Sequence, residues 1–235
     1  MAKSRYRGKL FSILGDSIST PEGYSDPPEA AFYQGMMRYY SGVYTPKESW
    51  WGQVIEALGG KVLSNNSFSG STVVKRPEYQ IPSYGCSDER TSALSRGGLC
   101  PEVILVFLGT NDWGYGVRIE KEQGQGDDPT VFSTAYGRML DLLRTNYPQA
   151  EILCLTLPRA LEEGLMQEDP LKRRGKSLED YCTAIKKQAA ARGCGVVDLY
   201  SSCPSFERVD DFHPNAAGMR SISGAVLGQL QGEDI

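Results

Sequence analysis

The feature that most constrains the fold is a pattern that occurs twice: a short apolar run that ends in glycine and small polar residues. Residues 102–108, EVILVFL, are β-branched, aromatic and apolar on both faces, which is typical of a central strand in a parallel sheet. This run ends in residues 109–112, GTND, and the apolar run 10–14 ends similarly in residues 15–17, GDS. Ligands of open parallel sheets bind beyond the carboxyl ends of the strands, so both endings are candidate site positions.

The remainder of the chain alternates strand-like with helix-like segments. Alternation of this kind predicts βαβ units around a parallel sheet, and therefore an α/β fold. The 235 residues contain no repeat and no convincing linker, so one domain over 1–235 is the prediction, with an aromatic-rich insertion at about 21–51. Helices are predicted at 49–58, 88–96, 132–146, 178–192 and 215–231, and further strands at 61–65, 152–157 and 196–199.

Two long connections leave their roles open. The segment 21–51 follows Ser17 directly and either forms a wall on which a sugar or aryl group stacks, or simply packs its rings onto the body of the protein. The segment 114–129, dense in glycine and charge, is either a flap or a solvated loop. The aromatic side chains of the first segment are Tyr24, Phe32, Tyr33, Tyr39, Tyr40, Tyr44, Trp50 and Trp51.

Composition excludes several classes of protein. The net charge of −4 gives no basic footprint for nucleic acid, and without a run of eighteen apolar residues no membrane span is expected. Six cysteines without a CxxC pair indicate free thiols and a reducing, cytoplasmic setting. With a single histidine, His213, the chain offers few zinc ligands, and we predict neither a metal nor a cofactor.

A candidate nucleophile and base can be paired. A serine hydroxyl needs a neighbouring general base, so a Ser-His pair must join Ser17, or another serine, to His213. An acid beside the imidazole orients it and stabilises its protonated form. Asp210 and Asp211 compete for this role, and we prefer Asp210, because a spacing of three lets it fold back over a tight turn. Pro214 stiffens the backbone after the histidine and suits the first turn of a helix.

Acyl transfer also requires donors for the developing oxyanion. Three candidates follow the first three predicted strands: the N–H of Ser17, the N–H of Gly70 in the polar loop 65–71, and the side-chain amide of Asn111. Because these loops would leave one edge of a parallel sheet, the donors are expected to converge.

These residues resemble the four sequence blocks of the SGNH (GDSL-type) hydrolase family, in family order. The blocks are residues 15–17, the Gly70 loop, residues 109–112, and residues 210–214, which contain DxxHP and the only histidine. Two departures occur: Ile18 replaces the leucine of the GDSL name, and the second block lacks its more usual glycine.

The resemblance implies a three-layer α/β/α sandwich, flavodoxin-like, with a five-stranded parallel sheet. It implies Ser17 as nucleophile, His213 as base, Asp210 as orienting acid, and an oxyanion hole of Ser17, Gly70 and Asn111. The expected function is hydrolysis of short acyl esters, acetyl above all, on a small molecule or carbohydrate through an acyl-enzyme, without a cofactor.

Two alternatives stay open. An acyltransferase would use the same residues with an alcohol in place of water. A flavodoxin-like binding module would be non-catalytic, but no GxxxxGK[ST] or GxGxxG phosphate loop follows any strand. No GxSxG elbow is present either, which disfavours an α/β-hydrolase.

Overall fold

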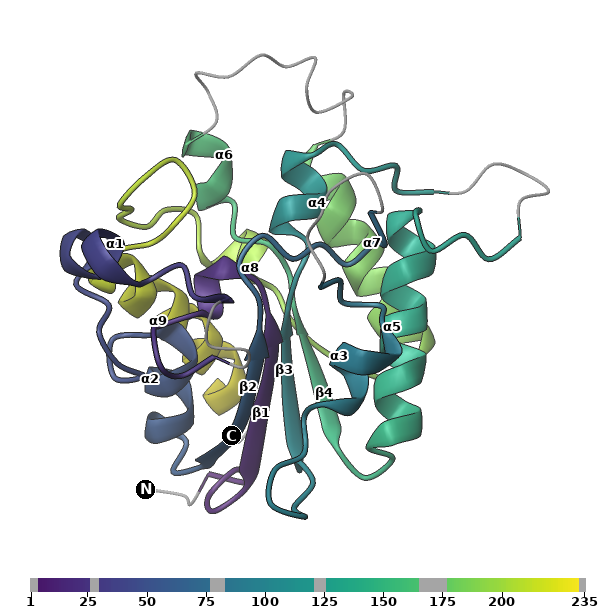
Figure 1. The fold of residues 1–235 in the computed structure, drawn as a ribbon, viewed down its shortest axis with the longest axis horizontal. Coiled ribbons are helices and arrows are strands. Elements are labelled where there is room, and N and C mark those ends of the chain that lie inside the picture. The colour runs from purple at the N-terminus through teal and green to yellow at the C-terminus, as the bar shows by residue number, and fades with distance from the viewer. Residues whose placement is uncertain (1–3, 26–29, 77–82, 121–125, 165–176, 233–235) are drawn as a thin grey trace.

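The computed structural model describes residues 4–25, 30–76, 83–120, 126–164 and 177–232 (Figure 1). Within these ranges one five-stranded sheet, parallel throughout, has the order β2-β1-β3-β4-β5. This is a flavodoxin-like order, so the predicted fold class is confirmed. The strands are β1 (Leu10–Gly15), β2 (Lys61–Ser67), β3 (Val103–Phe107), β4 (Glu151–Leu155) and β5 (Gly195–Val197).

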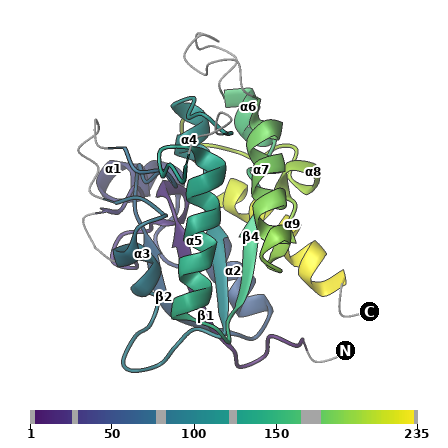
Figure 2. The same ribbon diagram turned by 90° about the vertical axis from the view of Figure 1, so that its right-hand side faces the viewer.

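Helices cover both faces of the sheet and complete the three layers. Helices α2 and α9 contact each other on one face, and α3, α5 and α7 lie against the other (Figures 1 and 2). The described helices are α1 (Gly35–Ser41), α2 (Trp50–Ala57), α3 (Asp88–Ser92), α4 (Thr110–Gly114), α5 (Phe132–Asn146), α6 (Ala160–Gly164), α7 (Leu178–Ala191), α8 (Leu199–Ser202) and α9 (Ala216–Gly232), with a 3-10 turn at Ser17–Ser19.

Local chemistry explains where the main helices begin. Ser49 caps α2 by accepting a hydrogen bond from the N–H of Gly52, and Ser177 forms a capping box with Asp180 at the start of α7. Gly52 is required for packing, since a Cβ there would lie 1.9 Å from the carbonyl oxygen of Pro46. The apolar side of α5, predicted from its helical spacing, is buried against the sheet, and the predicted bounds match.

The bounds of most predicted elements differ from the structure by one or two residues, and two differences have an identifiable cause. The second strand continues through Ser67 instead of ending in a polar loop, because its polar side chains are paired: Asn65 donates to the carbonyl of Ser19, and Ser67 donates to Asn65. Helix α3 begins after a Ser87 cap and ends at Ser92, four residues before the predicted end at 96. It stops early because the N–H of Leu94 is taken by the Tyr147 hydroxyl.

The register of the sheet brings three loops together. Gly15, the last residue of β1, pairs with Ser67 at the end of β2 and with Phe107 at the end of β3. The loops that follow these three strands therefore leave the same edge at neighbouring positions. Among the described helices, none combines the length and the apolar character needed to cross a membrane.

Candidate active site

Ser17 stands at the carboxyl end of β1, on the first residue of the 3-10 turn. Asp16 caps this turn, since its Oδ1 accepts a hydrogen bond from the N–H of Ile18 at 3.1 Å. Gly15 makes room for the turn: a Cβ there would lie 2.7 Å from the hydroxyl oxygen of Ser19 and 2.8 Å from that of Ser67. Glycine at position 15 and aspartate at position 16 therefore allow Ser17 to begin a buried turn directly after the strand.

The only histidine lies against this serine. His213 Nε2 is 2.8 Å from Ser17 Oγ, and His213 Nδ1 is 2.9 Å from each carboxylate oxygen of Asp210. An ionised carboxylate only accepts, so Nδ1 carries the proton and Nε2 is the acceptor that faces the serine hydroxyl. The structure brings together the three residues that the sequence paired, and Asp211 does not make these contacts.

The Asp210 carboxylate is held by its own turn as well. Its Oδ1 accepts from the backbone N–H of Phe212 at 2.9 Å and from that of His213 at 2.7 Å. Partial burial raises the pKa of Asp210, but the hydrogen bonds and charge of His213 and the Phe212 N–H lower it more, leaving it below its ordinary value. Asp210 is therefore ionised at neutral pH and able to stabilise a protonated imidazole.

Part of the aromatic segment 21–51 positions this histidine. The ring of Phe32 stacks on the imidazole of His213, with centroids 3.5 Å apart and an interplanar angle of 13°. The adjacent Tyr33 donates its hydroxyl to the carbonyl of Pro214 at 2.9 Å. The backbone N–H of Phe32 in turn donates to the hydroxyl of Thr20, just after the serine turn. Phe32 and Tyr33 therefore pack onto the body of the protein, which was the second of the two interpretations of this segment.

The rest of the segment divides into buried and exposed rings. Trp50 and Trp51 are buried and donate their indole N–H groups to Ser19. Tyr39 and Tyr40, on α1, are 70% and 63% exposed and contact each other edge to face.

The three candidate oxyanion donors lie on the three adjoining loops. The Asn111 amide donates one hydrogen bond to the carbonyl of Ser71 at 2.9 Å, which ties the loop after β3 to the Gly70 loop; its second N–H is a further donor. Gly70 has φ = +78°, in the region that favours glycine. Within the described part of the chain, the backbone N–H groups of Ser17 and Gly70 donate to no other group.

A small cavity opens at the serine. It has a volume of about 210 Å³, and its lining is more apolar than polar. Gly70 does not belong to the described lining, so its role as a donor stays a prediction. The lining includes Ser17, Ile18, Asn111, Tyr115, Phe212 and His213. Tyr115 and Phe212 were not assigned to the site from the sequence, since they carry no pattern of their own, and Ile18 was identified there only as the departure from the GDSL name.

A buried arginine, also missed at the sequence level, connects the loops of the site. Arg90 on α3 is 4% exposed, and all three of its nitrogens donate hydrogen bonds. Its acceptors are Asn66 Oδ1 (2.6 Å), Ser71 Oγ (2.7 Å), Ser83 Oγ (2.8 Å), the Asn66 carbonyl (2.6 Å) and the Gly15 carbonyl (3.0 Å). Burial lowers the pKa of Arg90 to about 10. The guanidinium therefore joins the end of β1 to the end of β2 and to the Gly70 loop.

A buried acid fixes the same loops from the other side. Asp112 is fully buried and accepts hydrogen bonds from the N–H groups of Val73 and Val74 at 2.8 and 3.2 Å. Burial raises the pKa of Asp112 from 3.8 to about 7. The folded state thus binds this proton more tightly than the unfolded chain. The resulting stabilisation is complete below pH 3.8 and is lost as the pH rises through about 7.

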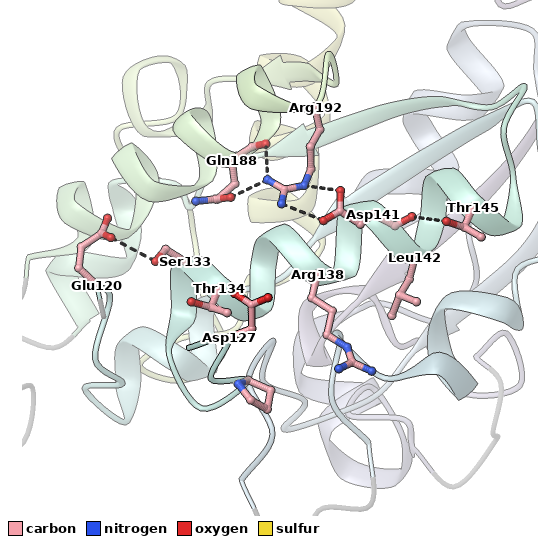
Figure 3. A pocket seen from close by; sticks show the side chains of 11 residues that line it. Glu120, Asp127, Ser133, Thr134, Arg138, Asp141, Leu142, Thr145, Gln188 and Arg192 are labelled. Carbon is pink, nitrogen blue, oxygen red and sulfur yellow. Dashed lines mark hydrogen bonds and ion pairs between the residues drawn. The ribbon is translucent and has the colours of Figure 1, made fainter. Parts of the chain in front are cut away.

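A larger cavity lies elsewhere, on the outer side of α5 and α7. It has a volume of about 520 Å³ and shares no lining residue with the cavity at Ser17. Figure 3 shows that several of its polar groups are paired with one another: Arg192 donates to Asp141 and to Gln188, and Ser133 donates to Glu120. We therefore place the chemistry at Ser17. Of the segment 114–129, interpreted from the sequence as either a flap or a solvated loop, residues 121–125 lie outside the described ranges.

The fold and the site define a class: a hydrolase with a three-layer, flavodoxin-like α/β/α fold in which a serine, a histidine and an aspartate lie in hydrogen-bonded order. Residues 9–168 match the family model of the GDSL-like Lipase/Acylhydrolase family. The chain belongs to this family of carboxylic ester hydrolases, as the sequence blocks predicted.

Solved structures agree with this assignment. The chain is similar to a candidate GDSL-like lipase from Bacteroides ovatus, with 25% identity, a TM-score of 0.73 and coverage of 96% of this chain and 99% of that one. A candidate GDSL-like lipase from Bacteroides uniformis is 27% identical, with a TM-score of 0.71 and 96% coverage of both chains. A family two carbohydrate esterase from Clostridium thermocellum, solved with cellohexaose, shares the fold at 18% identity, with a TM-score of 0.60 and coverage of 99% and 66%.

A curated protein matches part of the chain. It is the cellulase/esterase CelE of Acetivibrio thermocellus, 27% identical over 106 residues, or 45% of this chain. The matched region spans only 11% of the length of that relative.

Proposed function

We propose that this protein is a serine esterase that removes short acyl groups, acetyl above all, from a carbohydrate or similar alcohol. The observation that carries the proposal is the hydrogen-bonded line from Asp210 through His213 to Ser17, which ends at a cavity of about 210 Å³. Pockets that enclose drug-sized ligands measure roughly 300–1,000 Å³, so this one suits a small acyl group.

The chemistry follows from the arrangement. Ser17 Oγ attacks the ester carbonyl carbon while His213 Nε2 takes the hydroxyl proton, and Asp210 stabilises the imidazolium that forms. The bond from the carbonyl carbon to the alcohol oxygen then breaks, and the alcohol leaves with the proton from His213. Water then attacks the acyl carbon while His213 Nε2 takes its proton. The bond from that carbon to Ser17 Oγ breaks, Ser17 Oγ receives the proton from His213, and the carboxylic acid leaves.

The developing oxyanion would be stabilised by the N–H of Ser17, the N–H of Gly70 and the amide of Asn111. Two of these groups donate to nothing else within the described part of the chain, and the third retains a second N–H. The relatives support a carbohydrate as the alcohol, since an esterase of the same fold was solved with cellohexaose.

A matched pair of serine variants tests the proposal. Ser17→Ala should abolish hydrolysis of p-nitrophenyl acetate and labelling by a fluorophosphonate, whereas Ser221→Ala, on the exposed side of α9, should retain both. Within the p-nitrophenyl series, kcat/KM should fall as the acyl chain grows beyond the cavity. Labelling at another serine, or a rate that rises with chain length, would overturn the proposal. Product analysis with added sugar acceptors separates hydrolysis from acyl transfer.

A further inference from the structure

A second cavity adjoins the one at Ser17, and Tyr115 stands between them. The second cavity has a volume of about 310 Å³ and is lined predominantly by polar surface, whereas the lining at Ser17 is more apolar than polar. Among the described residues, Tyr115 alone belongs to both linings; its neighbour Gly114 lines the cavity at Ser17, and Gly116 lines the second. The ring is therefore the boundary between an apolar and a polar space.

The position of Tyr115 is fixed at its backbone and at its ring. Its backbone N–H donates to the carbonyl of Asn111 at 2.9 Å, which attaches it to the end of α4. The guanidinium of Arg76, which lines the second cavity, lies over the ring, 4.3 Å from its centroid. Because a cation over an aromatic face is attracted to it, Arg76 holds the ring from the side of the second cavity.

The two residues that flank Tyr115 add no side chain to this boundary. Both are glycines, and Gly116 has φ = +63°, in the left-handed region that favours glycine. A Cβ at Gly114 would enter open space. Within residues 114–116, one aromatic ring therefore closes the cavity at Ser17 toward its neighbour.

We propose that Tyr115 sets the length of the acyl group that the enzyme accepts, because its ring ends the apolar cavity at Ser17. This assignment rests on the proposed ester hydrolysis. An acyl group with its carbonyl at Ser17 would lie among Ile18, Phe212 and the Tyr115 ring. A chain longer than the cavity must leave this lining, and each methylene that stays in water forgoes about a fourfold gain in binding.

The kinetic test compares p-nitrophenyl acetate with p-nitrophenyl hexanoate. Tyr115→Ala joins the two cavities, so the ratio of kcat/KM for hexanoate to kcat/KM for acetate should rise by about tenfold or more. This is less than full burial of the added methylenes would give, because the lining of the second cavity is mostly polar. Tyr115→Phe keeps the ring and should keep the wild-type ratio. A general loss of alignment would lower both rates and leave the ratio unchanged.

Tyr44→Ala is the matched control. Tyr44 is 40% exposed, against 38% for Tyr115, and also has an arginine over its ring, since Arg38 lies 5.3 Å from the centroid. It does not belong to the described lining of either cavity, so its replacement should leave the acyl ratio as in the wild type. An unchanged ratio in Tyr115→Ala, or an equal change in Tyr44→Ala, would overturn the role of Tyr115 even if ester hydrolysis at Ser17 is established.

A binding test separates this boundary from catalysis. Saturation-transfer NMR with hexanamide and acetamide, which are neutral and not esters, compares Ser17→Ala with Ser17→Ala/Tyr115→Ala. The hexanamide signal, relative to that of acetamide, should increase in the double variant. If the wild type hydrolyses neither ester, the esterase proposal fails, and this comparison alone decides whether Tyr115 limits the cavity. Equal relative signals in the two proteins would overturn the boundary itself.

Discussion

Replacing Arg90 tests whether one buried guanidinium holds the loops of the site together. In Arg90→Met, the buried carbonyl and side-chain oxygens of Asn66 lose their charged donor, and so does the carbonyl of Gly15. A hydrogen bond to a charged group contributes about 1.5–3 kcal/mol. The five bonds do not simply add, because the hydroxyls of Ser71 and Ser83 can rotate toward other acceptors and because burying the cation costs free energy of its own.

The expected loss in the free energy of unfolding is therefore about 3–5 kcal/mol, because three buried oxygens lose their donor at about 1–3 kcal/mol each, while the cost of burying the cation is removed. Urea titration measures it, followed by the fluorescence of the buried tryptophans Trp50, Trp51 and Trp113. Arg90→Lys should fall between the wild type and Arg90→Met, because an ammonium reaches fewer of these acceptors at once.

Arg138→Met is the matched control, since the Arg138–Asp88 ion pair is exposed and should contribute less than about 1 kcal/mol. In folded Arg90→Met, kcat should also fall, and added guanidinium should partly restore it if the guanidinium itself aligns the loops. A loss of less than about 1 kcal/mol in Arg90→Met, or one no greater than in Arg138→Met, would refute the reasoning.

Three further predictions concern single side chains. Asn111→Ala should lower kcat by roughly 10²–10³ with little change in KM, as loss of one oxyanion donor does; an unchanged kcat would remove this amide from the site. Phe32→Leu should lower kcat by about 2- to 10-fold, because an aromatic pair contributes about 0.5–1.5 kcal/mol to holding the imidazole of His213; a Phe32→Tyr rate close to wild type is the control. In Asp112→Asn the residue no longer titrates. The unfolding free energy of the wild type minus that of the variant should therefore fall by up to about 4 kcal/mol between about pH 4 and 8, whereas a pH-independent difference would contradict the raised pKa of this acid.

Hydrophobic periodicity and the positions of turn-forming residues were sufficient to predict the main strands and helices of the sheet and its two covering layers. The run 102–108 contains a strand that is buried at every position, and residues 132–146 form a helix with one buried side. In both segments the pattern of apolar residues follows the burial directly, so the element can be predicted from the sequence. Short helices such as α4 and α8 span five and four residues, too few for a period to appear. The longer β2 was underpredicted, because its polar side chains are satisfied by partners on another segment, such as the carbonyl of Ser19.

The residues of the candidate site also differ in whether the sequence could predict them. Ser17, Asp210 and His213 could be paired from the sequence because the chain has one histidine and because the acid lies three residues from it. Arg90 could not be found, since a single arginine in a helical segment reads as a surface residue and its acceptors come from β1, β2 and two loops. Its role depends on contacts distant in sequence, which no local pattern encodes.

The aromatic segment connects the two halves of the proposed catalytic pair. Ser17 and His213 are 196 residues apart in the sequence, so their hydrogen bond requires two separate loops to be held in register. Phe32 provides one such link, with its N–H on Thr20 beside the serine turn and its ring on the imidazole. A ring used in this way is not available to a substrate. If the segment also contacts a sugar, the contact must come from its exposed rings, such as Tyr39 on α1 or Tyr24, and these can be replaced without disturbing the histidine.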